Sequence, residues 1–164
     1  MSNVQGDPNW ICDTVKTQAL ACLTAQGDSA YTGLTALAYD PVDPSVVTAS
    51  LPRLVVDFSF PTPSTFDRAD QMTEQTEKLT IKYFHQIAAN DAGGEQATRA
   101  VRKALWVLKR LLARNASLWG TVAASRLAAA KIEDIPADLV RSAGVTAKWG
   151  WVQVDVKSRV LPLT

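Results

Sequence analysis

Side chains that could perform catalysis are few in this sequence, and their spacing matches no known catalytic constellation. His85 is the single histidine, and it shares one side of an alternating segment with Leu79, Ile81 and Tyr83. A serine hydrolase would need a nucleophile in a turn such as G-x-S-x-G, which the sequence lacks. We therefore interpret His85 as a hydrogen-bonded histidine of the core or of a sheet edge, and we expect no catalytic residues and no enzymatic activity.

Residues that could hold a metal ion or a cofactor are equally sparse. Cys12 and Cys22 are the two cysteines, and with one histidine they do not complete the four ligands of a structural zinc site. Ten residues of a helix span about 15 Å, whereas a disulfide requires Cα atoms within about 7 Å. Gly93-Gly94 is an isolated pair rather than a phosphate-binding loop. We expect two packing thiols in a reducing compartment, no metal and no cofactor.

Positive charge gathers on one side of the segment 95–114. The basic residues of that side are Arg99, Arg102, Lys103, Lys109, Arg110 and Arg114. Six cations could neutralise several phosphates of a nucleic acid, and Trp106 stands four residues from both Arg102 and Arg110. The alternative is a solvent-facing helix whose arginines meet acidic residues of the same chain or of a neighbour. We favour the alternative because no motif that reads a nucleic-acid groove accompanies the charge.

Two tryptophans near the end of the chain could anchor an interface. Trp149 and Trp151 are two residues apart, so in a strand both indoles lie on one face, next to charged positions. Exposed aromatic side chains with flanking charge are typical of interface anchors. The alternative, that a helix of the same chain covers them, stays open.

The two parts of the chain carry opposite charge. Residues 1–70 hold three basic residues and eight aspartates, a net −5, whereas residues 71–164 hold fourteen basic and eight acidic residues, a net +6. One interpretation is two solvated faces of opposite sign. The other is self-complementarity, in which an acidic surface of one copy meets a basic surface of the next, head to tail.

These residues must be positioned by elements that the hydrophobic periodicity predicts. Helices are expected over 8–25, with Asp7 as N-cap and Gly27 as the stop, and over 95–114. Strands are expected over 34–39, 53–60, 77–87 and 148–160, with a less certain strand within 122–130. The segment Pro61–Asp70 predicts a mobile loop or a hairpin arm.

The predicted fold class is α+β, in the order α-β-β-α-β-β. We expect one domain, 1–164, with a small and mostly antiparallel sheet that carries a long β-hairpin arm and is packed by two α-helices. Apolar residues make up 47% and charged residues 20% of the chain, as in soluble globular proteins. No stretch approaches the roughly 20 apolar residues of a membrane span, so we expect a soluble, intracellular protein without membrane contact.

The order and spacing of four segments resemble the tail terminator proteins of long-tailed bacteriophages, the ring-forming family that includes the one of phage lambda. The segments are the opening amphipathic helix, the proline-bounded strand LPRLVVDF (51–58), the strand 77–87 with helix 95–114, and LWGTV (118–122) with the terminal strand 148–160. The likeness covers nearly the whole chain. Residues 28–50 and 128–145 are long relative to the family's pattern.

The resemblance implies a structural protein of the virion, assembled in the host cytoplasm, that forms a hexameric, head-to-tail ring at the head-proximal end of the tail tube. The ring would end tube polymerisation and offer a docking surface to the head connector. Its partners would be further copies of itself, the tail tube protein and the head-connector (stopper) protein. DNA would pass through the lumen without sequence-specific binding.

Within this resemblance, the Pro61–Asp70 arm and the surface of helix 95–114 are the expected ring or tube contacts. The candidate interface residues are Phe66, Arg68, Arg99, Arg102, Trp106, Arg110, Trp149 and Trp151. Charge reversal at Arg102 and Arg110 is expected to weaken assembly without unfolding the monomer. A neck protein of the same virion (head-closure or tail-completion) and a nucleic-acid-binding module using helix 95–114 remain alternatives.

Overall fold

A computed structural model describes residues 4–59, 65–67, 72–134 and 146–160 of the chain. The helices are α1 (Pro8–Thr24), the 3₁₀ turn η1 (Ser29–Tyr31), α2 (Ser45–Thr48) and α3 (Glu95–Arg114). The strands are β1 (Thr35–Leu37), β2 (Arg53–Ser59), β3 (Thr65–Asp67), β4 (Met72–Gln86), β5 (Ala124–Asp134) and β6 (Ala147–Val160). The α+β class predicted from the sequence is confirmed.

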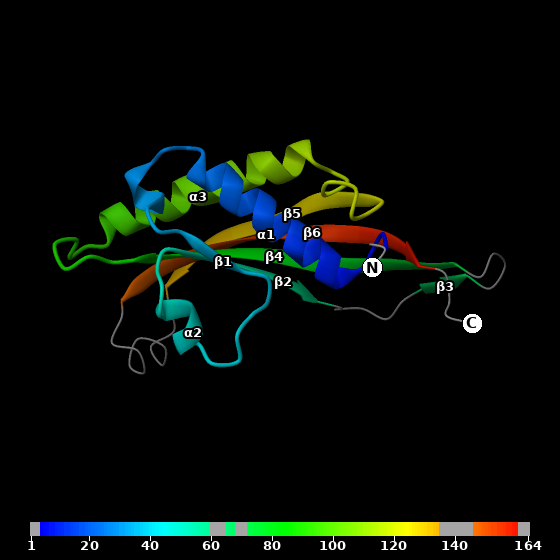
Figure 1. Cartoon of the computed structure of the whole chain (residues 1–164), viewed down its shortest axis with the longest axis horizontal. Coiled ribbons are helices and arrows are strands. Elements are labelled where there is room, and N and C mark those ends of the chain that lie inside the picture. The colour runs from blue at the N-terminus through cyan, green and yellow to red at the C-terminus, as the bar shows by residue number, and fades with distance from the viewer. Residues whose placement is uncertain (1–3, 60–64, 68–71, 135–145, 161–164) are drawn as a thin grey trace.

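The strands form one sheet in the order β1-β2-β4-β6-β5. Neighbouring strands are antiparallel except β1, which pairs in parallel with β2 and makes the sheet mixed. The short β3 pairs with the beginning of β4, beyond the residues of β4 that pair with β2. In Figure 1, β3 lies at one end of the elongated sheet, where a hairpin arm was expected. The other residues of the predicted Pro61–Asp70 arm lie outside the described residues.

Helix α1 begins and ends as its sequence predicts. The Asp7 carboxylate accepts a hydrogen bond from the Asn9 backbone N–H at 2.9 Å, and a proline fills the first helical position. Gly27, with φ of +67°, follows the end of the helix. The buried residues recur at three- and four-residue intervals, and they are Ile11, Cys12, Val15, Ala19 and Leu23. This stripe faces the sheet and fixes the rotation of the helix about its own axis.

Helix α3 spans the predicted residues, and the side opposite its basic residues is buried, including Ala97, Val101, Ala104, Leu105, Leu108 and Leu112. Its first turn is held by Asp91, whose carboxylate accepts hydrogen bonds from the backbone N–H groups of Gln96 and Ala97. The helix lies close to β6 at Gly150. A Cβ at this glycine would lie 2.8 Å from Leu105 Cδ1 and 2.9 Å from Lys131 O, so the approach of helix to strand requires glycine there.

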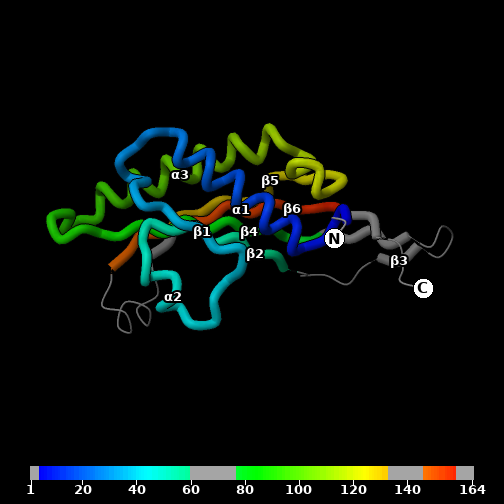
Figure 2. The backbone as a smooth tube through the Cα atoms, in the orientation of Figure 1, coloured from blue at the N-terminus to red at the C-terminus, as the bar shows by residue number. Residues whose placement is uncertain are grey.

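The main core lies between the sheet and the two long helices, which share one face of it (Figures 1 and 2). Its strand residues are at most 1% exposed, and they include Leu54, Val56, Leu79, Ile81, Tyr83, Val152, Val154 and Val156. Alternation in the sequence places these residues on one face of each strand, and in the structure that face is the one buried beneath the helices. Fully burying such a side chain contributes about 2 kcal/mol.

A second, smaller cluster lies on the opposite face of the sheet, where Figure 1 shows α2. Val47 of α2 packs there with Val55, Phe84 and Ala147. The one-turn helix α2 is an addition to the predicted element order. The Ala-rich segment forms strand β5, as the sequence favoured, with a register shift between Leu127 and Ala129.

Candidate subunit interface on the outer face of α3

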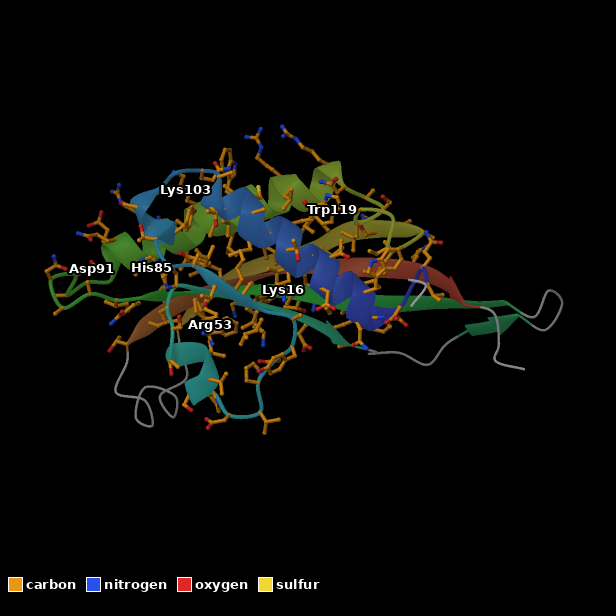
Figure 3. The ribbon with its side chains drawn as sticks, viewed as in Figure 1. Lys16, Arg53, His85, Asp91, Lys103 and Trp119 are labelled. Atoms are coloured by element: carbon orange, nitrogen blue, oxygen red, sulfur yellow. The ribbon has the colours of Figure 1, made fainter. Side chains whose placement is uncertain are left out.

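The basic side of α3 points away from the sheet, because the apolar stripe on its other side is buried against the core. Two of its six cations have acidic partners within the chain. Arg99 Nη2 lies 2.9 Å from Glu95 Oε1, one turn away. Lys103 Nζ lies 2.7 Å from Asp28 Oδ2, and this contact lowers the pKa of the Asp28 carboxyl. Figure 3 shows Lys103 toward the same end of the molecule as His85 and Asp91.

The remaining four cations of α3 are exposed and make no ion pair with any acidic side chain of the described ranges. They are Arg102, Lys109, Arg110 and Arg114. Three of the four lie in the last two turns of the helix, where the helix dipole favours positive charge. This end of α3 therefore presents positive charge to the surroundings.

Trp106 stands in the middle of this charge and is 55% exposed. The guanidinium carbon of Arg110 lies 4.6 Å from the centre of its indole ring, within the range of a cation–π contact. The two side chains are one turn apart, so the helix itself holds them together. A large indole partly covered by a guanidinium and otherwise open to water is the type of side chain that is enriched at binding hot spots.

A groove of about 280 Å³ runs beside this pair, between the last turns of α1 and the second half of α3. It is lined by Cys22, Gln26, Trp106, Val107, Arg110, Leu111 and Arg114. Val107 is buried, so one wall is apolar, while the two arginines supply charge. The groove can accept a protruding apolar side chain with an acidic neighbour.

The groove brings together Trp106 and Arg110 of the candidate residues and adds Arg114, Cys22 and Gln26, which were not predicted. The contribution of α1 required knowing that α1 and α3 lie side by side, and no local pattern carries that information. Arg114 is one turn beyond Arg110, and this spacing was the available signal for it. Arg102 lies on the same exposed side of α3 but outside the groove.

Trp149 packs against other residues of its own chain. Its ring stacks on Phe84, with ring centres 5.2 Å apart and planes 7° apart. It packs against the cluster of Val47, Val55, Phe84 and Ala147, so residues of its own chain bury part of the indole. Trp151 is half-buried on the same face, paired with Lys82 on β4 and Lys131 on β5.

Of the Pro61–Asp70 arm, the structure describes only the backbone of β3 (Thr65–Asp67). Phe66 lies in β3 opposite Thr73 of β4. Arg68 lies outside the described residues.

His85 is hydrogen-bonded, as expected. Its Nδ1 lies 2.8 Å from the Tyr83 hydroxyl, and the two rings stack with centres 5.9 Å apart. Burial lowers the pKa of His85, while nearby Asp28 and Asp91 act in the opposite direction. Within the described ranges, no three His, Cys, Asp or Glu side chains converge as a metal site would require.

The comparisons with known proteins add no relative: no family model matches the sequence, and no curated protein matches it. Among the described helices, none has the length and apolar character needed to cross a membrane.

Proposed function

We propose that the chain is a structural protein of a long-tailed bacteriophage, of the tail terminator type. It forms a hexameric ring on the head-proximal end of the tail tube, ends tube polymerisation and provides the docking surface for the head connector. The observation that carries the proposal is the outer face of α3, where exposed Trp106, Arg110 and Arg114 line a groove and neither arginine has an acidic partner in the described chain.

Such a surface suits a protein that binds other proteins through a permanent contact. Trp and Arg dominate interface hot spots, and charge around them steers a partner of opposite sign. In a head-to-tail ring, every copy uses two different surfaces. The excess of aspartate in residues 1–70 provides a source of the second, acidic surface.

The order of elements supports the same proposal. An opening helix, a hairpin with an extension at β3, a second long helix and two final strands follow the order on which the resemblance rests. A head-closure or tail-completion protein of the same virion shares the structural role and differs in its partner, so the test must involve the tail tube.

The test is the length and extensibility of tail tubes assembled with this chain and without it. Tail tube protein from the same virus is polymerised, and the tubes are imaged by electron microscopy. A terminator leaves tubes that carry a ring at one end and do not lengthen when more tube protein is added. Tubes that continue to grow, with no ring bound, would contradict termination and favour another neck component.

A nucleic-acid-binding function is the second candidate, and the Trp106–Arg110 pair favours it. An exposed indole can stack on a base, and Arg110 and Arg114 can contact phosphates. This function predicts DNA affinity that falls steeply as salt is raised. The measurement is the dissociation constant for a short DNA at two salt concentrations, with Arg110→Glu as the comparison.

A further inference from the structure

A second exposed apolar surface lies in the segment 38–46. Of the described residues, the large apolar side chains that remain exposed are Val4, Tyr39, Val42, Val46 and Trp106. Three of these five belong to the segment 38–46, and Val42 is fully exposed. Isolated exposed apolar residues need no explanation, but three within eight residues mark a contact surface.

The exposed charges of this segment are negative. Asp40 and Asp43 are both exposed, and the sequence has no lysine or arginine from Thr17 to Pro52. The Asp43 carboxylate accepts a hydrogen bond from the Ser45 backbone N–H at 2.9 Å, which lowers the pKa of Asp43 and keeps it charged at neutral pH. Asp40 Oδ2 lies 2.9 Å from Lys82 Nζ of β4, so the segment is tied to the sheet. These contacts hold the segment in one shape.

The segment 38–46 and the α3 groove lie on opposite sides of the sheet. Figure 1 shows α2, which follows directly after Asp43, on the face that α1 and α3 leave free. The segment 38–46 is therefore apolar and acidic, and the groove on the other side of the sheet is apolar and basic. Two different and complementary surfaces on opposite sides produce head-to-tail contacts, which close into a ring or continue as a filament.

We propose that the segment 38–46 of one copy docks into the α1–α3 groove of the next copy. Val42 enters the groove beside Trp106, and Asp40 and Asp43 face Arg110 and Arg114 of the neighbour. The groove, at about 280 Å³, falls just below the volumes of about 300–1,000 Å³ that are typical of small-molecule sites. That size suits a protruding side chain. This inference rests on the proposed ring and names the contact that builds it.

A second copy explains more of the surface than a nucleic acid does. DNA phosphates would pair with Arg110 and Arg114, but they would leave Tyr39 and Val42 on the opposite side without a partner. Docking of a neighbouring copy covers both surfaces and pairs charges of opposite sign. The observations therefore favour a protein contact between copies.

The native thiol Cys22 in the groove makes the contact measurable. Val42→Cys places one new thiol at the tip of the segment, where full exposure makes the substitution harmless to folding. Cys12 is buried, and burial raises its pKa to about 12, so it does not compete. The V42C protein is treated with a short bismaleimide and separated by denaturing electrophoresis. Val4→Cys, at another exposed valine, is the matched control.

The expected result is a ladder of covalent oligomers longer than dimers, because each copy offers one thiol on each surface. Within an assembled ring the two thiols react at an effective concentration near the millimolar range, so V42C should cross-link about tenfold or more faster than V4C. Adding Cys22→Ser to V42C should abolish the ladder. Native mass spectrometry of the untreated protein accompanies the experiment.

Three results would overturn the proposed contact. Dimers that persist in the V42C/C22S double variant would indicate a two-fold contact between the segments themselves. No ladder from a protein that native mass shows to be a ring would place the ring contact elsewhere and leave the proposed function standing. No ladder from a protein that is monomeric at every concentration would remove the contact, and the tube-length experiment would then decide the proposed function separately.

Discussion

Two tryptophans that look alike in the sequence have different surroundings in the structure. Lys148 directly precedes Trp149, Arg102 and Arg110 lie one helical turn from Trp106, and both tryptophans were candidates for an interface. Trp149 stacks on Phe84 and packs against the α2 cluster, whereas Trp106 is 55% exposed beside Arg110. The first region is completed by its own chain, and the second requires a partner to be covered.

The difference shows that neighbouring charges along the chain do not decide whether an aromatic side chain is exposed. Packing against distant residues decides it: Trp149 packs against a cluster that includes Val47 of α2, about one hundred residues earlier, whereas Trp106 is 55% exposed. The contrast predicts that substitutions at the two tryptophans act on different measurements. One should change folding stability, and the other should change assembly.

Trp149→Ala should have the largest effect on folding. Removing a half-buried indole that stacks on Phe84 should lower the free energy of unfolding by about 2–3 kcal/mol. Chemical denaturation of the isolated monomer measures this loss, and Trp149→Phe, which keeps a stacked ring, should recover most of it. A Trp149→Ala protein with unchanged stability and lost assembly would reverse the assignment of the two regions.

Trp106→Ala should act on assembly. Loss of a hot-spot tryptophan should weaken the contact between copies by about 2 kcal/mol, roughly 30-fold in the dissociation constant. The free energy of unfolding of the monomer should change by no more than about 0.5 kcal/mol, as for exposed positions. Sedimentation velocity over a concentration series measures the first quantity, and denaturation measures the second. A fall in stability with intact assembly would show that Trp106 serves the chain's own packing.

Charge reversal at Arg102 and Arg110 should have a smaller, salt-dependent effect. The double variant Arg102→Glu/Arg110→Glu should weaken association by about tenfold at low salt, and less at high salt, because rim charges are screened. Arg99→Glu/Lys109→Glu is the matched control, with the same change in charge on the same helix: neither of its residues lines the groove, whereas Arg110 of the tested pair does. Equal weakening by both variants would mean that overall charge matters rather than the groove.

Glu77 is a buried carboxyl of the sheet, and its substitution tests how burial of a charged group affects stability. It is 4% exposed, its Oε2 has no hydrogen-bond partner in the described structure, and burial raises its pKa. A carboxyl whose pKa is higher in the folded than in the unfolded state binds more protons when folded, so stability falls as pH rises above its ordinary pKa. Glu77→Gln should therefore stabilise the protein at pH 7, by about 1 kcal/mol. The gain should shrink as pH falls from the raised pKa of Glu77 toward the ordinary glutamate value, and it should be absent below that value. A gain that is independent of pH would exclude ionisation of Glu77 as the cause.

Local patterns were sufficient for much of this fold. The three- and four-residue spacing in α1 and α3, and the alternation in β2, β4 and β6, gave the elements and their buried faces, because burial repeats with the period of each element. The parallel pairing of β1 with β2 and the packing of Trp149 against Phe84 and its cluster could not be predicted in the same way. They depend on contacts between residues far apart in the chain.

Only part of the candidate site could be predicted from the sequence. Trp106 and Arg110 follow from the pattern of one helix, but the groove also needs Cys22 of α1 and Gln26, which follows the end of α1. The acidic surface was visible as a charge imbalance in residues 1–70, yet its apolar tip at Val42 became evident only from exposure. A hydrophobic residue next to two prolines and two aspartates gives no sequence signal of its own.

The central claim is that the groove side of α3 is a contact between copies, and native mass against concentration tests it most directly. Wild-type protein and Arg110→Glu/Arg114→Glu are compared at the same concentrations and salt. The wild-type protein should reach a closed species of about six 17.7 kDa chains, whereas the variant should remain a folded monomer. Identical mass distributions for the two proteins, at every concentration, would contradict the claim.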